Sequence, residues 1–377
     1  MSFAAVLERL RKVENPYPGM RPFETEEAHL YYGRDPQIAE LLRRLERHRF
    51  LAIVGVSGSG KSSLVLAGLI PALTRRAPWR IIRMRPQADP YSELSSAASL
   101  DPATLRASSF GLINALAEIS VPVLLIVDQF EEIFRYQDYR GLSSEQKSNQ
   151  AALSADFVQL LLSTSAESRN ISVVITMRSD YLGACAEFRA LPEAINGAQY
   201  LVPRLTREQL TEAIKGPLGT VPIAPALAQQ LLNDLGDDPG RLPLLQHALM
   251  RTWNRWKQDD PNGSRPIDLS DYQNIGRIEG ALDQHADELL QGLPEDLARI
   301  VFQRLTARSS DQRERRDPAA VAELSELCQS SQLNEVLDRF RLGQATFLTP
   351  RDADLTPDTY IDITHESLIW NWTKLKQ

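Results

Sequence analysis

The 377-residue sequence predicts an α/β fold, in which a parallel sheet flanked by helices is followed by a mainly helical half. Three observations lead to this prediction. Short runs of consecutive apolar residues at 50–54 and 123–127 indicate strands buried on both faces of a sheet. The glycine-rich stretch 55–62 lies between the first of these strands and a helical run. After Pro203, the apolar residues recur at helical spacing until two final strand-like segments near the C-terminus.

Length and composition narrow the class of protein. A chain of this length suggests two or three domains, at about 100–200 residues each. The 42 basic and 49 acidic residues give a net charge of −7, which provides no reason to expect nucleic-acid binding. The two cysteines, Cys185 and Cys328, have no metal-ligand spacing, and the N-terminus has no signal-like apolar region, so we expect a reduced, cytoplasmic location. The longest aliphatic run is far shorter than the roughly 20 residues that span a bilayer, so no membrane association is expected.

Two predicted segments make up residues 1–30. Apolar residues at helical spacing predict a short amphipathic helix over 2–13. The prolines that follow exclude a regular helix over 14–30, so this stretch is expected to be an extended arm that either wraps the next domain or links to it.

A turn and a helix precede the glycine-rich stretch. Asp35 followed by Pro36 is typical of an N-cap with proline at the first helical position. Apolar residues 38, 41, 42 and 45 fall on one face of the predicted helix. Gly33 and Arg34 are therefore expected on a tight turn directly before it.

Residues 55–62 fit the phosphate-loop pattern G-x-x-x-x-G-K-[S/T]. Glycines allow the backbone to bend until its N–H groups surround an anion. We expect Lys61 to reach the β- and γ-phosphates and the Ser62 hydroxyl to hold Mg²⁺, beside the N-terminus of the next helix. The expected nucleotide-binding residues of this stretch are Gly55, Val56, Ser57, Gly58, Ser59, Gly60, Lys61, Ser62 and Ser63.

Further strands are expected at 80–84, 122–128, 171–180 and 199–202, and helices at 103–118 and 143–166. Asp128 ends one of these strands, at the sheet edge where ligands bind in open α/β folds. Because Mg²⁺ takes one or two carboxylates, we predict that Asp128 and Ser62 form the metal site.

Three charged residues near this edge are candidate catalytic groups. Glu131 or Glu132 can act as the base that orients the attacking water, or both can simply begin a solvated helix. Arg178, at the end of the fourth strand, can sense the γ-phosphate through charge-assisted hydrogen bonds, or it can be an exposed strand end.

The C-terminal half predicts helices and a closing hairpin. A proline-containing turn at 236–243 leads into an apolar helix with Trp253 and Trp256, and the polar stretch 257–270 indicates a subdomain boundary. The remaining helices are expected at 206–215, 224–235, 278–291, 294–306, 318–328 and 332–341. Strands at 345–349 and 360–364 then suggest a β-hairpin, and hence a winged helix.

Seven motifs occur in a fixed order, at 15–23, 31–34, 55–62, 128–132, 176–180, 240–243 and 365–366. Together they resemble the STAND class of P-loop NTPases, and most closely its bacterial branch, which is related to the NACHT and NB-ARC switches and is often fused to WD repeats. The resemblance extends from about Asn15 to Trp372.

This resemblance implies a P-loop NTPase parallel sheet flanked by helices, followed by a helical lid domain and a winged-helix domain. The implied domains are an N-terminal helix and arm (1–30), a nucleotide-binding domain (31–203), a lid (204–270) and a winged helix (271–377). The implied sheet has the Arg178 strand between the phosphate-loop strand and the Asp128 strand.

Roles for individual residues also follow from the resemblance. Gly33 and Arg34 would line the adenine pocket, Pro243 would pack against the adenine, and His365 would hold the β-phosphate of ADP in a closed state. The family base usually follows the Mg²⁺-binding Asp directly. Here that position is Gln129, which leaves Glu131 or Glu132 as substitutes.

The implied function is a signalling switch gated by ATP and ADP. The ADP form is closed, the ATP form assembles into a homo-oligomer, and slow ATP hydrolysis with Mg²⁺ acts as a timer. We expect sensor and effector parts in a longer protein or in partner proteins, and defence against phage as the setting. The alternatives are a non-hydrolysing ATP-binding scaffold and a conventional ATPase or kinase.

Overall fold

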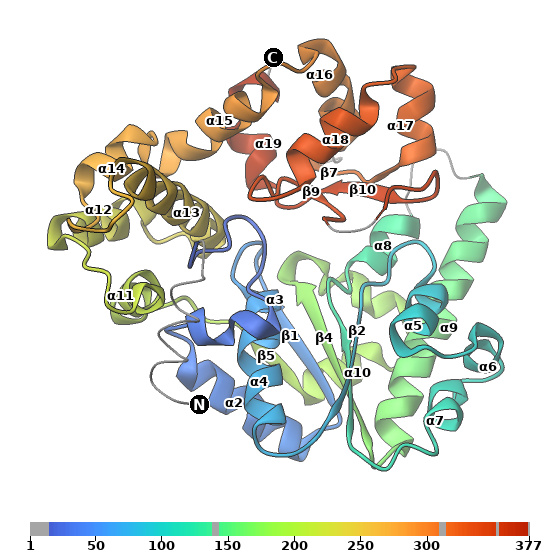
Figure 1. The fold of residues 1–377 in the computed structure, drawn as a ribbon. Coiled ribbons are helices and arrows are strands. Elements are labelled where there is room, and N and C mark those ends of the chain that lie inside the picture. The colour runs from blue at the N-terminus through green and yellow to red at the C-terminus, as the bar shows by residue number, and fades with distance from the viewer. Residues whose placement is uncertain (1–14, 138–142, 309–313, 352–353, 376–377) are drawn as a thin grey trace. The chain divides into compact units, whose positions relative to one another are not determined.

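The computed structural model describes residues 15–137, 143–308, 314–351 and 354–375. The helix predicted over 2–13 lies outside these residues. The chain divides into two compact units (Figure 1). The phosphate-loop unit is Phe23–Leu205, and the helical unit consists of the chain from Thr206 onward together with the segment that ends at Pro22.

Five parallel strands form the sheet of the phosphate-loop unit, in the order β2-β3-β4-β1-β5. Their bounds are β1 (Phe50–Gly55), β2 (Arg80–Met84), β3 (Val123–Val127), β4 (Ile171–Arg178) and β5 (Gln199–Leu201). The predicted parallel sheet is therefore confirmed, and β4 lies between β1 and β3 as the family resemblance implied. In this register Gly55 is paired with Arg178, so the carboxyl ends of β1 and β4 meet at one edge.

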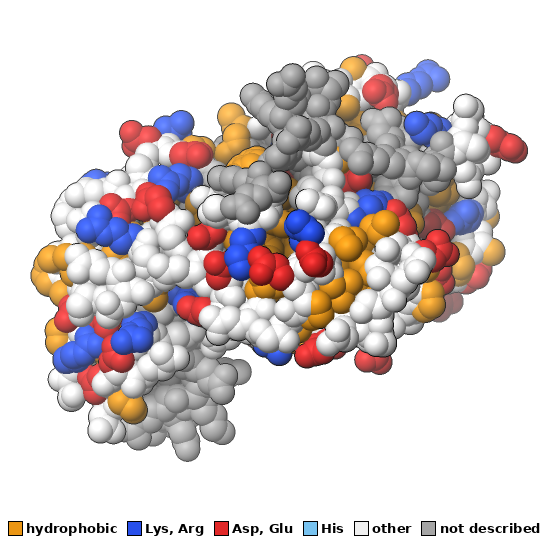
Figure 2. Space-filling view, turned by 90° about the horizontal axis from the view of Figure 1, so that it is seen from above, with side chains coloured by type: hydrophobic (Ala, Val, Ile, Leu, Met, Phe, Trp, Pro, Cys, Tyr) orange, Lys and Arg blue, Asp and Glu red, His pale blue; other side chains and the backbone are white. Residues whose placement is uncertain are grey.

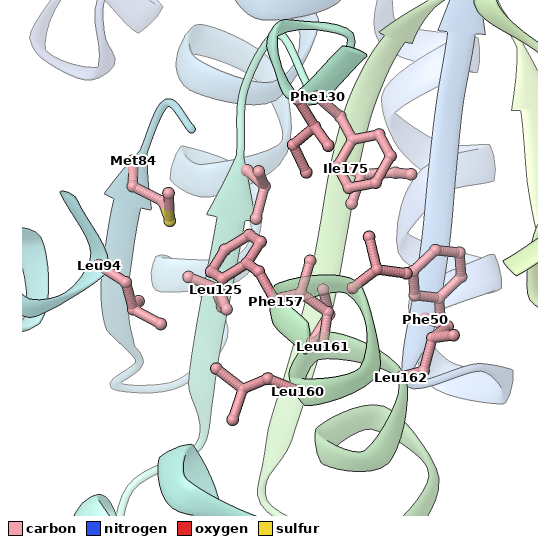
Figure 3. Close-up of a cluster of buried hydrophobic side chains, with 14 of the residues drawn as sticks. Phe50, Met84, Leu94, Leu125, Phe130, Phe157, Leu160, Leu161, Leu162 and Ile175 are labelled. Carbon is pink, nitrogen blue, oxygen red and sulfur yellow. The ribbon is translucent and has the colours of Figure 1, made fainter. Parts of the chain in front are cut away.

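Helices cover both faces of this sheet because successive strand residues point to opposite sides. Phe50, Ala52 and Val54 of β1 join one buried cluster, whereas Leu51 and Ile53 join another. Figure 3 shows the first cluster, in which apolar side chains of α9 pack against side chains of the strands. This layer also contains residues of α5, α7 and α10, and the opposite layer contains residues of α2, α4 and a π-helical turn at Leu64–Leu69. The helix bounds are α2 (Asp35–Arg47), α3 (Lys61–Ser63), α4 (Ile70–Thr74), α5 (Pro90–Ala98), α6 (Pro102–Arg106), α7 (Gly111–Ala115), α8 (Glu132–Gln137), α9 (Ser144–Glu167) and α10 (Leu191–Gly197).

The single helix predicted over 103–118 is wrong, because the structure has the two short helices α6 and α7 there. The chain turns between them, where the backbone N–H of Gly111 donates to the carbonyl of Ser108 at 2.9 Å. A Cβ atom at Gly111 would lie 2.4 Å from the carbonyl oxygen of Leu105, so only glycine fits this close approach. Leu105 and Leu112 are both fully buried. The apolar spacing therefore predicted correctly which side chains are buried, but it did not predict that the helix is interrupted between them.

The helical unit has two apolar cores. One contains Trp253, Trp256 and Tyr272, and the other contains Phe302, Phe340 and Trp372 in mutual ring contact. The helix bounds are α11 (Arg207–Lys215), α12 (Pro225–Leu235), α13 (Leu242–Asp259), α14 (Leu269–Asn274), α15 (Arg277–Leu290), α16 (Glu295–Arg304), α17 (Val321–Cys328), α18 (Leu333–Arg341) and α19 (Ser367–Asn371).

Short strands complete the helical unit. The expected antiparallel pair near the C-terminus is present as β9 (Leu348–Thr349) and β10 (Tyr360–Ile363). The sequence did not predict β8 (Ala319–Ala320), which pairs with β10, or the antiparallel pair β6 (Thr306–Arg308) and β7 (Glu314–Arg316). These segments have only two or three residues, too few to give an alternating pattern.

The proline-containing arm links the two units. In the helical unit, the Asn15 side chain donates to the carbonyl of Met250 at 2.9 Å, and the buried Tyr17 hydroxyl donates to the carbonyl of Ile214. In the phosphate-loop unit, the backbone N–H of Phe23 donates to Ser63 Oγ at 3.2 Å. The units are thus joined covalently at two places, between residues 22 and 23 and between 205 and 206.

Acidic and basic side chains are interspersed over the face shown in Figure 2. Within the described ranges, none of the helices combines the length and the apolar character needed to cross a bilayer.

Candidate functional site

The phosphate loop connects the end of β1 to α3. Gly58 and Gly60 adopt φ angles of +76° and +87°, which side chains with a Cβ atom rarely allow. A Cβ atom at Gly55 would lie 2.8 Å from Ser59 Oγ. The glycines at these three positions therefore permit the tight backbone curve that the motif predicted. Within the loop, Gly55 and Ser59 are buried, Val56 is exposed, and Ser57, Gly58, Gly60, Ser62 and Ser63 are partly buried.

Lys61 extends along the inner side of this loop. Its Nζ atom donates to the carbonyl oxygens of Gly55 and Val56, both at 2.9 Å. Burial lowers the pKa of Lys61, and the nearby Glu131 carboxylate is the strongest charge acting against this effect. A buried ammonium that is bound mainly by neutral carbonyls is stabilised further by an anion, and a phosphate group meets that requirement.

Asp128, directly after β3, is buried and is aimed at the loop. Its Oδ1 atom accepts hydrogen bonds from Ser62 Oγ at 2.8 Å and from Thr176 Oγ1 at 2.7 Å. Its Oδ2 atom accepts no hydrogen bond from the described residues, and lies 3.5 Å from Nε of Arg85. Burial acts to raise the pKa of Asp128, but the Arg85 charge and the two hydroxyls outweigh it and hold this pKa below its usual value. A serine hydroxyl beside an ionised carboxylate, one oxygen of which accepts no hydrogen bond from the described residues, is a donor set that fits Mg²⁺.

The two neighbouring glutamates have different surroundings. Glu131 is 3 % exposed, and its Oε2 atom accepts the backbone N–H of Arg178 at 3.3 Å, at the end of β4. Glu132 is 6 % exposed, and its Oε2 atom accepts the backbone N–H of Gln87 at 3.0 Å, in the loop after β2. Glu131 thus lies on the side of the loop lysine, whereas Glu132 is bound to a different loop.

The Arg178 side chain is held by an acidic neighbour that sequence reasoning did not single out. Its Nη2 and Nε atoms donate to the carboxylate of Asp180 at 2.7 and 3.1 Å. Burial acts to raise the pKa of Asp180, but its bond to Arg178 outweighs this effect and lowers that pKa. The guanidinium is thereby fixed at the edge of the sheet where β1 and β4 end.

Arg34 supports the phosphate loop from outside. The structure makes Arg34 the N-cap residue of α2, and Asp35 the first residue of that helix, so the predicted N-cap at Asp35 is wrong by one position. The buried guanidinium donates to the carbonyl oxygens of Pro203 at 2.8 Å and of Ser59 at 3.0 Å. Gly33, with φ of +82°, provides the turn that directs the chain into this helix.

The other two predicted site residues belong to the helical unit. Pro243 is partly buried in the first turn of α13. The Nδ1 atom of His365 accepts the backbone N–H of Ser367 at 3.2 Å, so the neutral ring carries its proton on Nε2. The structure therefore brings the phosphate loop, Asp128, the two glutamates, Arg178 and Arg34 together in one unit, and places Pro243 and His365 in the other.

The sequence analysis assigned no role to Thr176, Asp180 or Arg85, although the first two lie within the motif at 176–180. Thr176 gave a signal, because it is a polar residue inside the apolar run of β4, two positions before Arg178. Arg85 gave a weaker one, as a charged residue directly after a strand of the sheet.

The sequence and the fold of this chain were compared with those of known proteins. The family model described as Novel STAND NTPase 1 matches residues 16–377. A Walker-type ATPase of Pyrococcus abyssi is similar in structure, at 15% identity and a TM-score of 0.44, over 95% of this chain and 98% of that chain. The Cdc6p protein of Pyrobaculum aerophilum matches at 14% identity and a TM-score of 0.46, over 91% and 93% of the two chains. The ORC2 protein of Aeropyrum pernix in its ADP form matches at 12% identity and a TM-score of 0.48, over 94% and 93%. The search of curated proteins gives no match.

Proposed function

The chain belongs to the Novel STAND NTPase 1 family, and from this premise we propose that it is a switch gated by ATP and ADP that hydrolyses ATP slowly. The observation that carries the proposal is the contact of Ser62 with Asp128 at 2.8 Å, beside a buried Lys61 in a phosphate loop. These residues supply the three parts that a nucleotide tail requires: backbone amides, a cation and a metal-binding pair.

Each residue of this cluster has a distinct role in the proposal. The loop amides and Lys61 bind the β- and γ-phosphates. Ser62 and Asp128 hold Mg²⁺, which neutralises charge on the phosphate oxygens. Glu131 acts as the base that orients water, because it lies next to the Arg178 backbone on the side of Lys61. Arg178 contacts the γ-phosphate, with its guanidinium oriented by Asp180.

In this proposal, the conformation of the helical unit depends on which nucleotide is bound. We interpret helices α16 to α18 with the sheet β8-β10-β9 as a winged helix that carries His365. The Nε2–H of His365 is a suitable donor to the β-phosphate of ADP, and Pro243 is a suitable surface for adenine. Exchange of ADP for ATP shifts the population of closed and open forms only by the difference in affinity of each nucleotide for the two forms. The open form assembles with further copies of the chain.

A non-hydrolysing nucleotide-binding scaffold is the second candidate. Gln129, rather than an acidic residue, follows Asp128, and its backbone N–H donates to Thr176 Oγ1 at 3.0 Å. A carboxamide is not a general base, so this candidate holds if Glu131 plays no part in hydrolysis.

Calorimetry with Mg²⁺–ADP and Mg²⁺–ATP tests the proposal. We expect the wild-type protein to bind both nucleotides, and Lys61→Ala to lose at least about tenfold in affinity, since a charge-assisted contact is removed. Lys147→Ala, which removes an exposed lysine of the same unit, is the matched control and should bind like the wild type. Absence of binding to the wild-type protein contradicts the proposal.

The switch is tested separately by size-exclusion chromatography with ADP, ATP and a non-hydrolysable ATP analogue. We expect a larger assembly with the analogue than with ADP. His365→Ala should retain less ADP and assemble without the analogue. If this variant keeps the nucleotide content and the oligomeric state of the wild type, the proposed role of His365 is wrong.

A further inference from the structure

Arg85 is a charged group of the site that the phosphate-loop motif does not include. It follows β2 directly, and its Nε atom lies 3.5 Å from Asp128 Oδ2. The other oxygen of that carboxylate already accepts hydrogen bonds from Ser62 and Thr176. Arg85 is therefore the ion-pair partner of the oxygen that these two hydroxyls leave open.

The loop that carries Arg85 is fixed on several sides. Glu132 Oε2 accepts the backbone N–H of Gln87 at 3.0 Å, and the Gln150 side chain donates to the carbonyl of Ala88 at 2.7 Å. Gln87 has a φ of +47°, a conformation that a residue with a Cβ atom adopts only where its surroundings impose it. At the far end of the loop, Asp89 caps α5. The position of Arg85 is thus a built feature of the fold.

The Asp128 carboxylate has 1 % of its side chain exposed, so its negative charge requires a cation or several donors close by. A guanidinium and a divalent metal ion both meet this requirement. Two cations that share one carboxylate repel each other, and the repulsion is strong where water is largely excluded. Binding of a metal ion to Asp128 therefore competes with the Arg85 contact.

We propose that Arg85 is a built-in counter-ion of Asp128, which holds this carboxylate in place without metal and leaves it when Mg²⁺ binds with the nucleotide. The inference rests on the proposed nucleotide site. It makes Arg85 a positioning residue that raises the Mg²⁺ concentration needed for metal-dependent binding.

The test is a Mg²⁺ titration of the full chain with a fluorescent N-methylanthraniloyl derivative of ADP at fixed concentration. The readout is the Mg²⁺ concentration at half-maximal fluorescence change. We expect Arg85→Gln to lower this midpoint about tenfold, because the competing cation is gone. Arg85→Lys keeps the charge and should stay within about threefold of the wild type. Arg80→Gln removes an arginine at the opposite end of β2, whose Nη2 donates to the carbonyl of Ala98, and should leave the midpoint unchanged.

The outcomes separate this inference from the proposed function. If the wild-type protein does not bind the probe at any Mg²⁺ concentration, both are wrong. If the wild type binds and Arg85→Gln has an unchanged or higher midpoint, the role of Arg85 is wrong and the nucleotide site stands. If Arg80→Gln lowers the midpoint as much as Arg85→Gln, the effect is one of net charge and the specific contact is refuted. If Arg85→Gln does not fold, the milder variant Arg85→Lys tests the role of Arg85. This variant keeps the positive charge, so a Mg²⁺ midpoint well below that of the wild type would contradict the proposed counter-ion.

Discussion

Thr176 Oγ1 donates a 2.7 Å hydrogen bond to Asp128 Oδ1 and accepts the backbone N–H of Gln129 at 3.0 Å. One buried hydroxyl of β4 therefore holds both the side chain and the backbone at the end of β3. This arrangement joins the two strands at the point where the carboxylate of Asp128, the proposed Mg²⁺ ligand, leaves the sheet.

Thr176→Val should weaken both stability and metal-dependent nucleotide binding. The substitution keeps the shape of the side chain but removes a donor to a buried carboxylate, and leaves the Gln129 N–H without its acceptor. We expect the free energy of unfolding to fall by about 2 kcal/mol, measured by urea denaturation. Thr176→Ser, which keeps the hydroxyl, should lose less. Equal losses in the two variants would indicate packing rather than hydrogen bonding.

The two glutamates after Asp128 should respond differently to the same substitution. Glu131→Gln should reduce single-turnover ATP hydrolysis by about 100-fold or more, while ADP affinity stays within about threefold of the wild type. Glu132→Gln replaces the acceptor of the Gln87 N–H, so it should lower thermal stability and change hydrolysis by less than about tenfold. Reversal of this pattern would make Glu132 the base.

Arg34→Met should loosen the phosphate loop. The guanidinium bridges two carbonyl oxygens, one of Ser59 in the loop and one of Pro203, and it is 3 % exposed. Loss of both charge-assisted hydrogen bonds should reduce the free energy of unfolding by about 3 kcal/mol and weaken nucleotide binding. The matched control is Arg47→Met on the exposed side of α2, which should change stability by less than about 0.5 kcal/mol. Retention of nucleotide affinity by Arg34→Met would contradict support of the loop.

Two buried histidines should make the stability of the helical unit depend on pH. The Nε2 atom of His247 in α13 lies 3.0 Å from Nδ1 of His285 in α15, and both rings contact Phe347. Burial, together with the Arg251 charge, lowers the pKa of His285 to about 3, and burial also lowers the pKa of His247 well below 6.5. Arg251 in turn pairs with Glu288.

The sign follows from proton uptake. Both rings stay neutral in the folded protein, whereas in the unfolded chain each takes up a proton below about pH 6.5. The free energy of unfolding is therefore not reduced by these two groups above that pH, and it decreases progressively as the pH falls toward 3. At pH 5.5 the loss is about 1.4 kcal/mol for each histidine, relative to pH 7.5. Urea denaturation followed by tryptophan fluorescence should show a smaller decline for His285→Gln, and an unchanged decline for His48→Gln, which alters an exposed histidine. An equal decline in His285→Gln and the wild type would contradict this assignment.

Local patterns allowed prediction of strand β1, the phosphate loop and the helical run that begins at Lys61. A buried strand and a glycine-rich turn each impose their own backbone geometry. Asp128 was predictable for a related reason, since the end of a parallel strand determines where its next side chain lies. Contacts between distant segments were not predictable in this way. Arg34 meets Pro203 across 169 positions of the chain, and nothing near Arg34 indicates that partner.

The helix predicted over 103–118 illustrates a different limit. The apolar spacing was correct, but the close approach of Gly111 to the carbonyl of Leu105 interrupts the helix. Likewise, β8 forms by pairing with β10, in which Tyr360 lies opposite Ala320 although the two residues are 40 positions apart in the chain. Such elements are determined by tertiary packing rather than by their own residues.

The arm at residues 15–22 has a consequence for proteolysis. A cut between residues 205 and 206 produces two polypeptides, and the first of them contains Tyr17 and Met20, which are buried in the cores of the second. The fragments should therefore stay associated after cleavage. Removal of the first 22 residues would instead expose apolar surface in the second fragment and favour its aggregation.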